Sequence, residues 1–181
     1  MVYLAAATVF VGLLGLLNLV LTLAVVRRLR TLKDGSGRRA PVRVVPGLRT
    51  VGSKAPHFAA TTTTGRSAEL ANLAGRHAVI GFFSGTCEPC RDHLPGFVRV
   101  AGQLAEDSGQ AIAVIRGTDE ETADLLGLIN DKVMVIREPE GGPVGTAFAV
   151  RTYPSLYLLD GSGTITSAAH VAEHLSLPVL R

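Results

Sequence analysis

Cysteine and charge are both scarce in this sequence of 181 residues. Only two cysteines are present, which excludes the disulfide-dense scaffold of a small secreted protein. Charged residues make up 18% of the chain and apolar residues 47%, so the chain is neither disordered nor highly charged. We therefore expect one folded domain of common size, or a smaller domain with an appendage.

The excess of positive charge is confined to the first part of the chain. Residues 1–50 contain eight Lys or Arg and one acid, Asp34, which is a net charge of +7. Residues 51–181 contain ten Lys or Arg and fourteen acids, which is a net charge of −4. Nucleic-acid binding needs a basic face on the folded domain, so this distribution argues against nucleic acid as a partner.

No charged residue occurs between Val2 and Val26. A helix over this stretch would extend about 37 Å, which is longer than the ~30 Å hydrocarbon core of a bilayer. Buried core helices rarely run so long without a charge, and a cleaved signal peptide would carry basic residues before the apolar run. Here the basic residues follow it, starting at Arg27. We therefore predict an uncleaved transmembrane helix over residues 1–26, in contact with the lipid bilayer.

A basic stretch rich in Gly and Pro follows the predicted span. Gly and Pro break regular structure, so we predict a linker over residues 27–50 and one folded domain over residues 51–181. The cluster of basic residues from Arg27 to Arg43 favours a cytoplasmic domain. A single C-x-x-C pair on a membrane anchor instead favours the extracytoplasmic side, because disulfides persist outside the cytoplasm. On balance we expect a single-pass protein of the cell membrane with an extracytoplasmic domain.

The domain is predicted to alternate strands and helices. Apolar runs of strand length cover residues 78–83, 111–115 and 133–136, and helical apolar spacing follows the first of them from Cys87 to about Leu104. Thr118 and three acids predict the start of another helix, which ends near Ile129. A short helix at 144–148, a hairpin of strands 155–159 and 164–166, and a last helix at 168–175 complete the pattern. This order predicts an α/β sheet with helices on both faces.

Both cysteines lie in one C-x-x-C motif, Cys87-Glu88-Pro89-Cys90, at the start of a predicted helix. Unpaired N–H groups and the helix dipole favour an anion there, so we expect the Cys87 thiol to ionise readily and act as the nucleophile. Cys90 lies one turn further in and suits the resolving thiol. Pro89 fits the first turn because it lacks an N–H group. The motif predicts thiol–disulfide exchange without a cofactor, and the alternative is a structural disulfide or a chance spacing.

His93 adds a third potential metal ligand, in the pattern C-x-x-C-x-x-H. A structural zinc site needs a fourth ligand, and a c-type haem would need histidine where Arg91 stands. A copper-binding metallochaperone that uses Cys87, Cys90 and His93 is the main alternative to exchange. A scaffolding membrane accessory with dispensable cysteines is a third. Glu88, Pro89 and His93 are also candidates for tuning the thiols, and we expect the other histidines at the surface.

Two further motifs make the sequence resemble a known superfamily. Residues 51–58 read Val-Gly-Ser-Lys-Ala-Pro-His-Phe, and Pro154 follows Tyr153 downstream of the cysteines. In these features residues 51–175 resemble the thioredoxin-like superfamily, in its membrane-anchored TlpA/redoxin branch. The resemblance implies a thioredoxin-like fold, a central mixed sheet flanked by helices. It also implies that Pro154 is the cis-proline and that, with Tyr153, it contacts the backbone of the substrate.

Residues 84–90, Ser-Gly-Thr-Cys-Glu-Pro-Cys, are similar to the active-site motif of MauD-type methylamine dehydrogenase accessory proteins. Two positions depart from the wider superfamily: Thr86 replaces its common Trp, and His93 stands where cytochrome-maturation reductases often have Glu. The peroxiredoxin motif Pro-x-x-x-Thr-x-x-Cys is absent, because Ile80 and Ser84 occupy its Pro and Thr positions. The resemblance implies a client protein with cysteines and a membrane or soluble thiol electron carrier as partners.

Overall fold

A computed structural model describes residues 45–177 together with Gly12, Gly15 and Leu19. Apart from these three positions, the predicted span over residues 1–26 lies outside the described residues, as does the predicted linker up to residue 44. In the part of the chain that the structure describes, no helix is both long enough and apolar enough to cross a bilayer.

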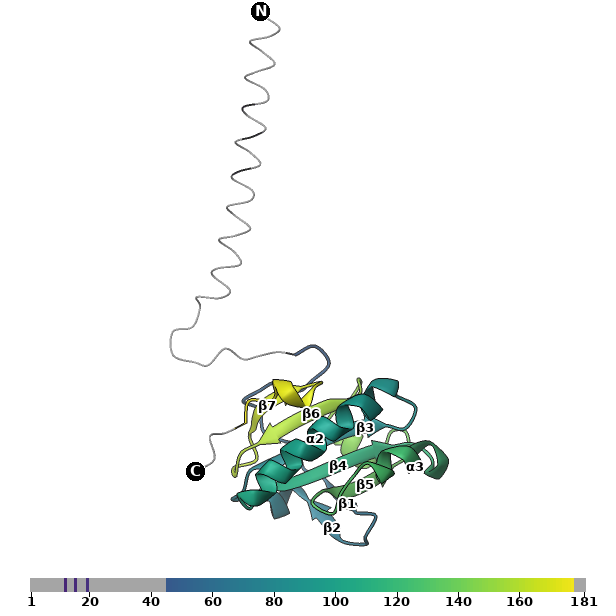
Figure 1. Cartoon of the computed structure of the whole chain (residues 1–181). Helices are drawn as coiled ribbons and strands as arrows, with labels where there is room; N and C mark the ends of the chain where they lie inside the picture. The colour runs from purple at the N-terminus through teal and green to yellow at the C-terminus, as the bar shows by residue number, and fades with distance from the viewer. Residues whose placement is uncertain (1–11, 13–14, 16–18, 20–44, 178–181) are drawn as a thin grey trace, which may run out of the picture. The chain divides into compact units, whose positions relative to one another are not determined.

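A mixed sheet of five strands, in the order β5-β4-β3-β6-β7, forms the centre of the domain (Figure 1). β3 (Ala78–Ser84), β4 (Gln110–Arg116) and β5 (Met134–Glu138) are parallel to one another. β6 (Ser155–Leu159) is antiparallel to β3, and β7 (Ile165–Ala169) is antiparallel to β6. All seven residues of β3 are buried, as expected for a continuous apolar strand that is covered on both faces. The predicted α/β fold with a mixed sheet is confirmed.

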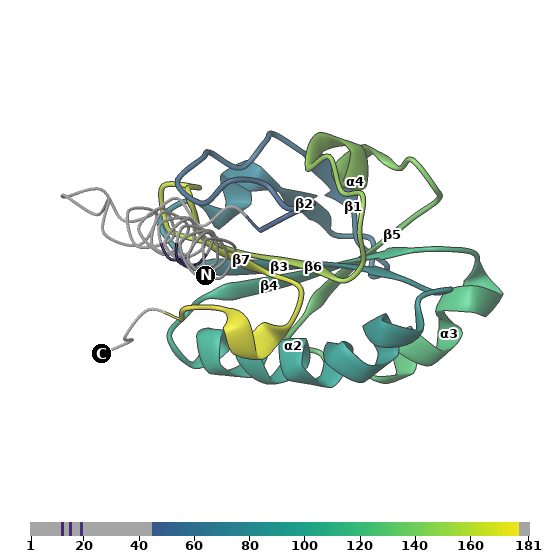
Figure 2. The ribbon, with the colours of Figure 1, turned by 90° about the horizontal axis from the view of Figure 1, so that it is seen from above.

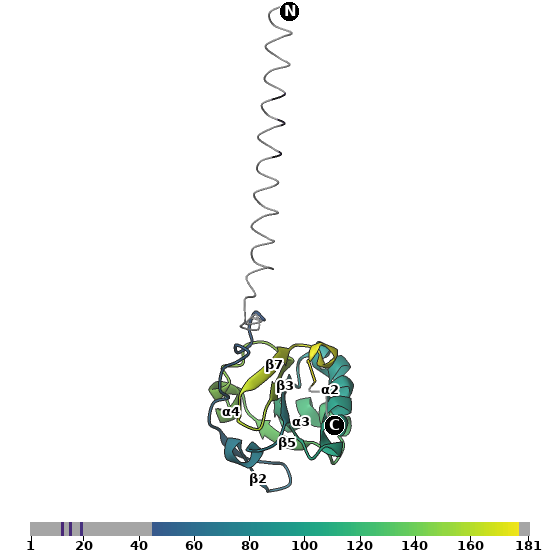
Figure 3. The same ribbon diagram turned by 90° about the vertical axis from the view of Figure 1, so that its left-hand side faces the viewer.

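Helices cover both faces of this sheet (Figures 2 and 3). One face carries the long helix α2 (Glu88–Glu106), α3 (Asp119–Gly127) and the 3-10 turn η2 (Ala172–His174). The other face carries α4 (Pro143–Ala147), the hairpin of β1 (Ala59–Thr61) and β2 (Ser67–Glu69), and the 3-10 turn η1 (Leu70–Leu73). The sheet therefore separates two hydrophobic cores.

Alternate side chains of β3 feed the two cores, because successive residues of a strand point to opposite faces. Val79 and Phe83 pack on the α2 side, in what we call the helical core. Ile80 and Phe82 pack on the α4 side, in what we call the aromatic core. The helical core includes Cys90, Leu94, Phe97, Val100 and Leu104, and the aromatic core includes Phe58, Val144, Phe148 and Tyr157.

The prediction of a last helix over residues 168–175 is wrong. Ala168 and Ala169 belong to β7, where they pair with Tyr157 and Leu156 of β6. Only the three residues of η2 are helical in this stretch. Pairing with a buried neighbouring strand overrides the helical preference of alanine.

Residues 46–49, which the sequence places in the linker, lie against the folded domain. The N–H group of Arg49 donates to the Tyr157 hydroxyl at 3.2 Å, and its Nη1 donates to the carbonyl oxygen of Ala147 at 3.2 Å. Gly47 has φ +81°, and a Cβ at this position would meet Oγ1 of Thr152 at 2.9 Å. The contacts with the domain therefore begin before residue 51.

Both outer strands of the sheet are hydrogen-bonded on their far side. Gly52 N–H donates to Ile165 O of β7 at 2.7 Å, and Ile165 N–H donates back to Ser53 O at 2.9 Å. At the opposite edge, Thr63 N–H donates to Val135 O of β5 at 2.8 Å. Segments that precede β3 in the sequence thus flank the sheet on both sides.

Candidate active site

Cys87 is the N-cap residue of α2, at the end of the loop that follows β3. Its side chain is partly buried, and its thiol donates to the carbonyl oxygen of Tyr153 at 3.5 Å. The first N–H groups of a helix have no partner within the helix, so a thiolate at this position faces the positive end of the helix dipole. The structure places Cys87 at the helix N-terminus, as the sequence predicts.

Cys90 lies one turn further along α2 and is fully buried in the helical core. Its sulfur accepts a hydrogen bond from the N–H group of Ser84 at 3.5 Å. Burial raises the pKa of Cys90 to about 12, and the neighbouring Cys87 thiol adds to that rise. Cys90 therefore keeps its proton at neutral pH.

The three residues that the sequence singles out for tuning all lie on α2. Glu88 and Pro89 are exposed in its first turn, where a carboxylate is favoured by the helix dipole and proline costs no hydrogen bond. His93 is partly buried in the next turn. Among the residues that the structure describes, no three His, Cys, Asp or Glu side chains form a group able to hold a metal ion. The structure therefore does not assemble Cys87, Cys90 and His93 into a metal site.

The peptide bond between Tyr153 and Pro154 is cis, as the resemblance implies. This bond lies in the loop before β6, and the hydrogen bond from Cys87 to Tyr153 O brings the loop beside the cysteine pair. Pro154 is buried, whereas Tyr153 is partly exposed. A partly exposed residue next to the more accessible sulfur is well placed to meet a substrate chain.

Two residues that the sequence does not single out also touch this loop. Cζ of Arg116, the last residue of β4, lies 5.3 Å from the centroid of the Tyr153 ring, a cation–π arrangement. Nδ1 of His170, the residue after β7, lies 2.7 Å from the carbonyl oxygen of Pro154. The sequence predicts only a surface histidine at position 170. No spacing in the sequence connects either residue to the cysteines, since only the sheet topology brings them together.

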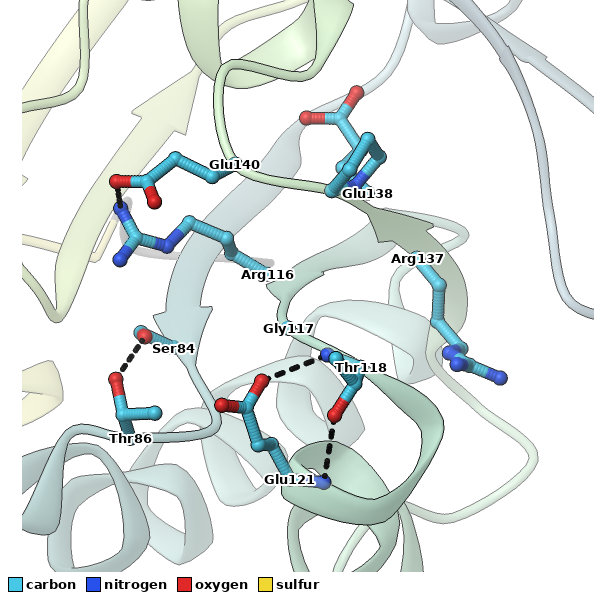
Figure 4. A pocket seen from close by; sticks show the side chains of 10 residues that line it. Ser84, Thr86, Arg116, Gly117, Thr118, Glu121, Arg137, Glu138 and Glu140 are labelled. Atoms are coloured by element: carbon cyan, nitrogen blue, oxygen red, sulfur yellow. Dashed lines mark hydrogen bonds and ion pairs between the residues drawn. The ribbon is translucent and has the colours of Figure 1, made fainter.

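A pocket of about 570 Å³ opens beside the cysteine loop (Figure 4). Ser84 and Thr86, whose hydroxyl oxygens are 3.2 Å apart, line one side of it, and Arg116 pairs with Glu140 at 3.0 Å above them. On the other side Thr118 and Glu121 form the capping box of α3. These polar groups are paired with one another around a pocket that reaches Thr86, the residue before Cys87.

Comparison with known proteins gives a consistent result. The model of the AhpC/TSA family matches residues 51–168. The thioredoxin-like protein YneN of Bacillus subtilis is 25% identical over 118 residues, which cover 63% of this chain and 68% of that protein. The thiol-disulfide oxidoreductase ResA of Halalkalibacterium halodurans is 28% identical over 122 residues, which cover 65% of this chain and 67% of that protein. The chain thus spans about two thirds of the length of the curated relatives it matches.

Solved structures agree on the fold. A candidate thiol:disulfide interchange protein DsbE from Chlorobium tepidum superposes with a TM-score of 0.58 at 24% identity, covering 67% of this chain and 84% of that one. The shared architecture is the thioredoxin-like fold, with its mixed sheet between two layers of helices.

Proposed function

The chain belongs to the AhpC/TSA family, and on that premise we propose that it is a thiol–disulfide oxidoreductase that works through Cys87 and Cys90. The observation that carries the proposal is the difference between the two thiols. Cys87 is accessible at the N-terminus of α2, whereas Cys90 is buried and has a pKa of about 12. An accessible attacking thiol beside a protected second thiol is the arrangement that disulfide exchange needs.

In the first step the Cys87 thiolate attacks one sulfur of the substrate disulfide. A bond forms between the Cys87 sulfur and that sulfur, the substrate disulfide breaks, and the departing sulfur takes the electron pair and then a proton. Cys90 does not compete in this step, because burial keeps it protonated. The product is a mixed disulfide between Cys87 and the substrate.

In the second step Cys90 attacks the Cys87 sulfur. A disulfide forms between Cys87 and Cys90, the mixed disulfide breaks, and the substrate leaves as a second thiol, so two electrons have passed from the protein to the substrate. The neighbouring Cys87 thiol is one cause of the raised pKa of Cys90. Once Cys87 is in the mixed disulfide it no longer raises the pKa of Cys90 in this way. Cys90 then ionises more easily, as its attack on the Cys87 sulfur requires.

The Tyr153–Pro154 loop would hold the substrate during both steps. Pro154 has no N–H group, so the polar groups of its neighbours are available to a bound chain. Tyr153 O already lies 3.5 Å from the Cys87 sulfur. An extended substrate chain beside the loop would pair with its backbone and bring a disulfide to Cys87. Glu88, Pro89 and His93 would then tune the thiol pair from α2.

Domain organisation and location complete the proposal. The proposal includes a transmembrane helix over residues 1–26, a linker over 27–50 whose residues 46–49 already contact the domain, and a domain over 51–181 on the extracytoplasmic side. The support is the uncharged run from Val2 to Val26 and the persistence of disulfides outside the cytoplasm. The partners would be a client protein with cysteines and a membrane or soluble thiol electron carrier. The motif of residues 84–90 further suggests a role like that of MauD-type accessory proteins.

Single serine variants of the two cysteines in the full chain test the chemistry. Cys87→Ser removes the attacking sulfur and should abolish insulin reduction with dithiothreitol as the recycling reductant. Cys90→Ser should instead trap Cys87 in mixed disulfides with insulin, visible on non-reducing gels. Alkylation of the reduced wild type should label Cys87 faster than Cys90 at neutral pH. Faster labelling of Cys90, or insulin trapped by the Cys87→Ser variant, would reverse the assigned roles.

Alkaline phosphatase fused after Arg181 tests the side of the membrane. This reporter needs its own disulfides, so an extracytoplasmic domain gives an active fusion. A stably expressed but inactive fusion would place the domain in the cytoplasm, as the basic residues from Arg27 to Arg43 favour.

A further inference from the structure

His170 lies between two segments of the chain, and the catalytic scheme gives this residue no role. Its Nδ1 is 2.7 Å from the carbonyl oxygen of Pro154, and its Nε2 is 3.3 Å from the carbonyl oxygen of Pro46. Pro154 belongs to the loop beside Cys87, and Pro46 belongs to the segment that precedes the domain. One partly buried ring thus faces both.

Both acceptors are carbonyl oxygens, so the ring must supply the proton in either hydrogen bond. A neutral imidazole carries one N–H group and can donate only once. The shorter contact, at 2.7 Å, assigns that proton to Nδ1 and the bond to Pro154. The 3.3 Å contact to Pro46 is the weaker of the two.

The bonded carbonyl belongs to the residue that follows Tyr153, whose own carbonyl oxygen faces the Cys87 sulfur at 3.5 Å. His170 therefore contacts Pro154, and the neighbouring Tyr153 contacts the Cys87 thiol. Nearby contacts brace the loop further: Ser155 Oγ donates to Thr152 O at 2.6 Å, and Gly47 lies against the Thr152 side chain.

We propose that His170 is a positioning residue for disulfide exchange, which fixes the Pro154 carbonyl through Nδ1–H and so holds the Tyr153–Pro154 loop in the orientation that receives a substrate chain. This inference rests on the proposed function. It assigns to His170, which lies outside the cysteine motif, a part in the binding of polypeptide substrates. The reacting sulfur atoms do not touch His170, so its effect is on binding of the chain beside Cys87. A small disulfide without a polypeptide backbone depends on it less.

Three substitutions in the full chain separate the two nitrogens of the ring. His170→Asn keeps an N–H donor near the position of Nδ1, His170→Gln keeps one near the position of Nε2, and His170→Phe keeps a ring but no donor. His174→Phe is the matched control, because His174 is an exposed histidine four residues further on. Insulin serves as the polypeptide disulfide and hydroxyethyl disulfide as the small one, each with dithiothreitol as reductant.

We expect His170→Phe and His170→Gln to raise the KM for insulin, relative to that for hydroxyethyl disulfide, about three- to tenfold, as the loss of one hydrogen bond predicts. His170→Asn should restore the wild-type ratio, and His174→Phe should not change it. Long-range proton–nitrogen NMR should find the ring proton of His170 on Nδ1. The Asn and Gln variants decide the result even if the Phe variant fails to fold.

An unchanged ratio in both the Phe and the Gln variants, or an Asn variant as impaired as the Gln variant, would overturn the positioning role, as would a proton on Nε2. Failure of the proposed function looks different, because the wild type would then reduce neither insulin nor hydroxyethyl disulfide.

Discussion

The two faces of the central sheet both bury a hydrophobic core, but the two cores serve different purposes. On one face the aromatic core packs Phe82, Phe148 and Tyr157 as tilted rings, with centroids 5.0 Å apart for the first two and 5.4 Å apart for the last two. On the other face the helical core encloses Cys90, whose raised pKa is caused mainly by that burial. Similar burial therefore serves stability on one side and the chemistry of a thiol on the other.

The largest expected effect is the loss of stability when a substitution leaves a cavity in either core. Phe148→Ala in the aromatic core should lower the free energy of unfolding by about 3–5 kcal/mol, and Leu94→Ala in the helical core by about 2–5 kcal/mol. Only the Leu94 variant should also lower the pKa of Cys90, because Leu94 lies one turn beyond it on the same face of α2. Urea unfolding and alkylation of Cys90 as a function of pH measure the two effects. The comparison fails if the Phe148 variant lowers this pKa as far as the Leu94 variant does.

Alkaline pH should weaken both cores, because burial raises the pKa of Cys90 in the helical core and the pKa of Tyr157 in the aromatic core, and Cys90 gives the contribution that one variant can isolate. The pKa of Cys90 is about 12 in the folded protein and 9.0 is its ordinary value, so between these values the unfolded chain loses the proton first. The stability that this group contributes is complete below about pH 9 and is lost as the pH rises toward 12, at up to about 1.4 kcal/mol per pH unit. Urea titrations of the reduced full chain should show this loss, and Cys90→Ala should reduce it. Equal slopes for the wild type and the variant would contradict the assignment.

The smallest expected effect concerns His93, which lies on the same helix as the cysteines but only partly buried. His93 follows Cys90 by three residues and lies on the next turn of α2, so we expect His93→Ala to displace the pH profile of insulin reduction only slightly. Binding of Cu(I) to the reduced chain should not depend on this residue. Tenfold weaker Cu(I) binding by the variant would instead favour the copper-carrier alternative, and no change in either assay would make His93 an ordinary surface residue.

Much of the fold is predictable from the sequence because its central elements carry strong local signals. The strands β3, β4 and β5 are continuous apolar runs, and α2 begins where the C-x-x-C motif meets helical spacing. The chain after residue 167 is not predictable in this way. Alanine has no preference for strands, and Ala168 and Ala169 belong to β7 because they pair with the neighbouring β6.

The candidate site divides along the same line. Cys87, Cys90 and Pro89 are local features, and the structure places them where the motif predicts. The resemblance to a known superfamily adds Pro154, whose cis bond the structure contains. Arg116 and His170 could not be found, because each follows or ends a strand whose place in the sheet decides what it touches. Contacts that depend on the order of strands in the sheet have no characteristic residue spacing, so the sequence does not predict them.

The covered edges of the sheet have a consequence for self-association. A bare outer strand offers its free N–H and C=O groups to any other chain and acts as a template for aggregation. Here Gly52 and Ser53 bond to β7, and Lys54 places a charge beside the same edge, with its Nζ 2.7 Å from Ser162 O. The short stretch that leads the chain into the domain thus blocks the docking of a second copy's strand. An approaching second copy would meet a strand whose first residue, Ile165, is already paired, which disfavours edge-to-edge association.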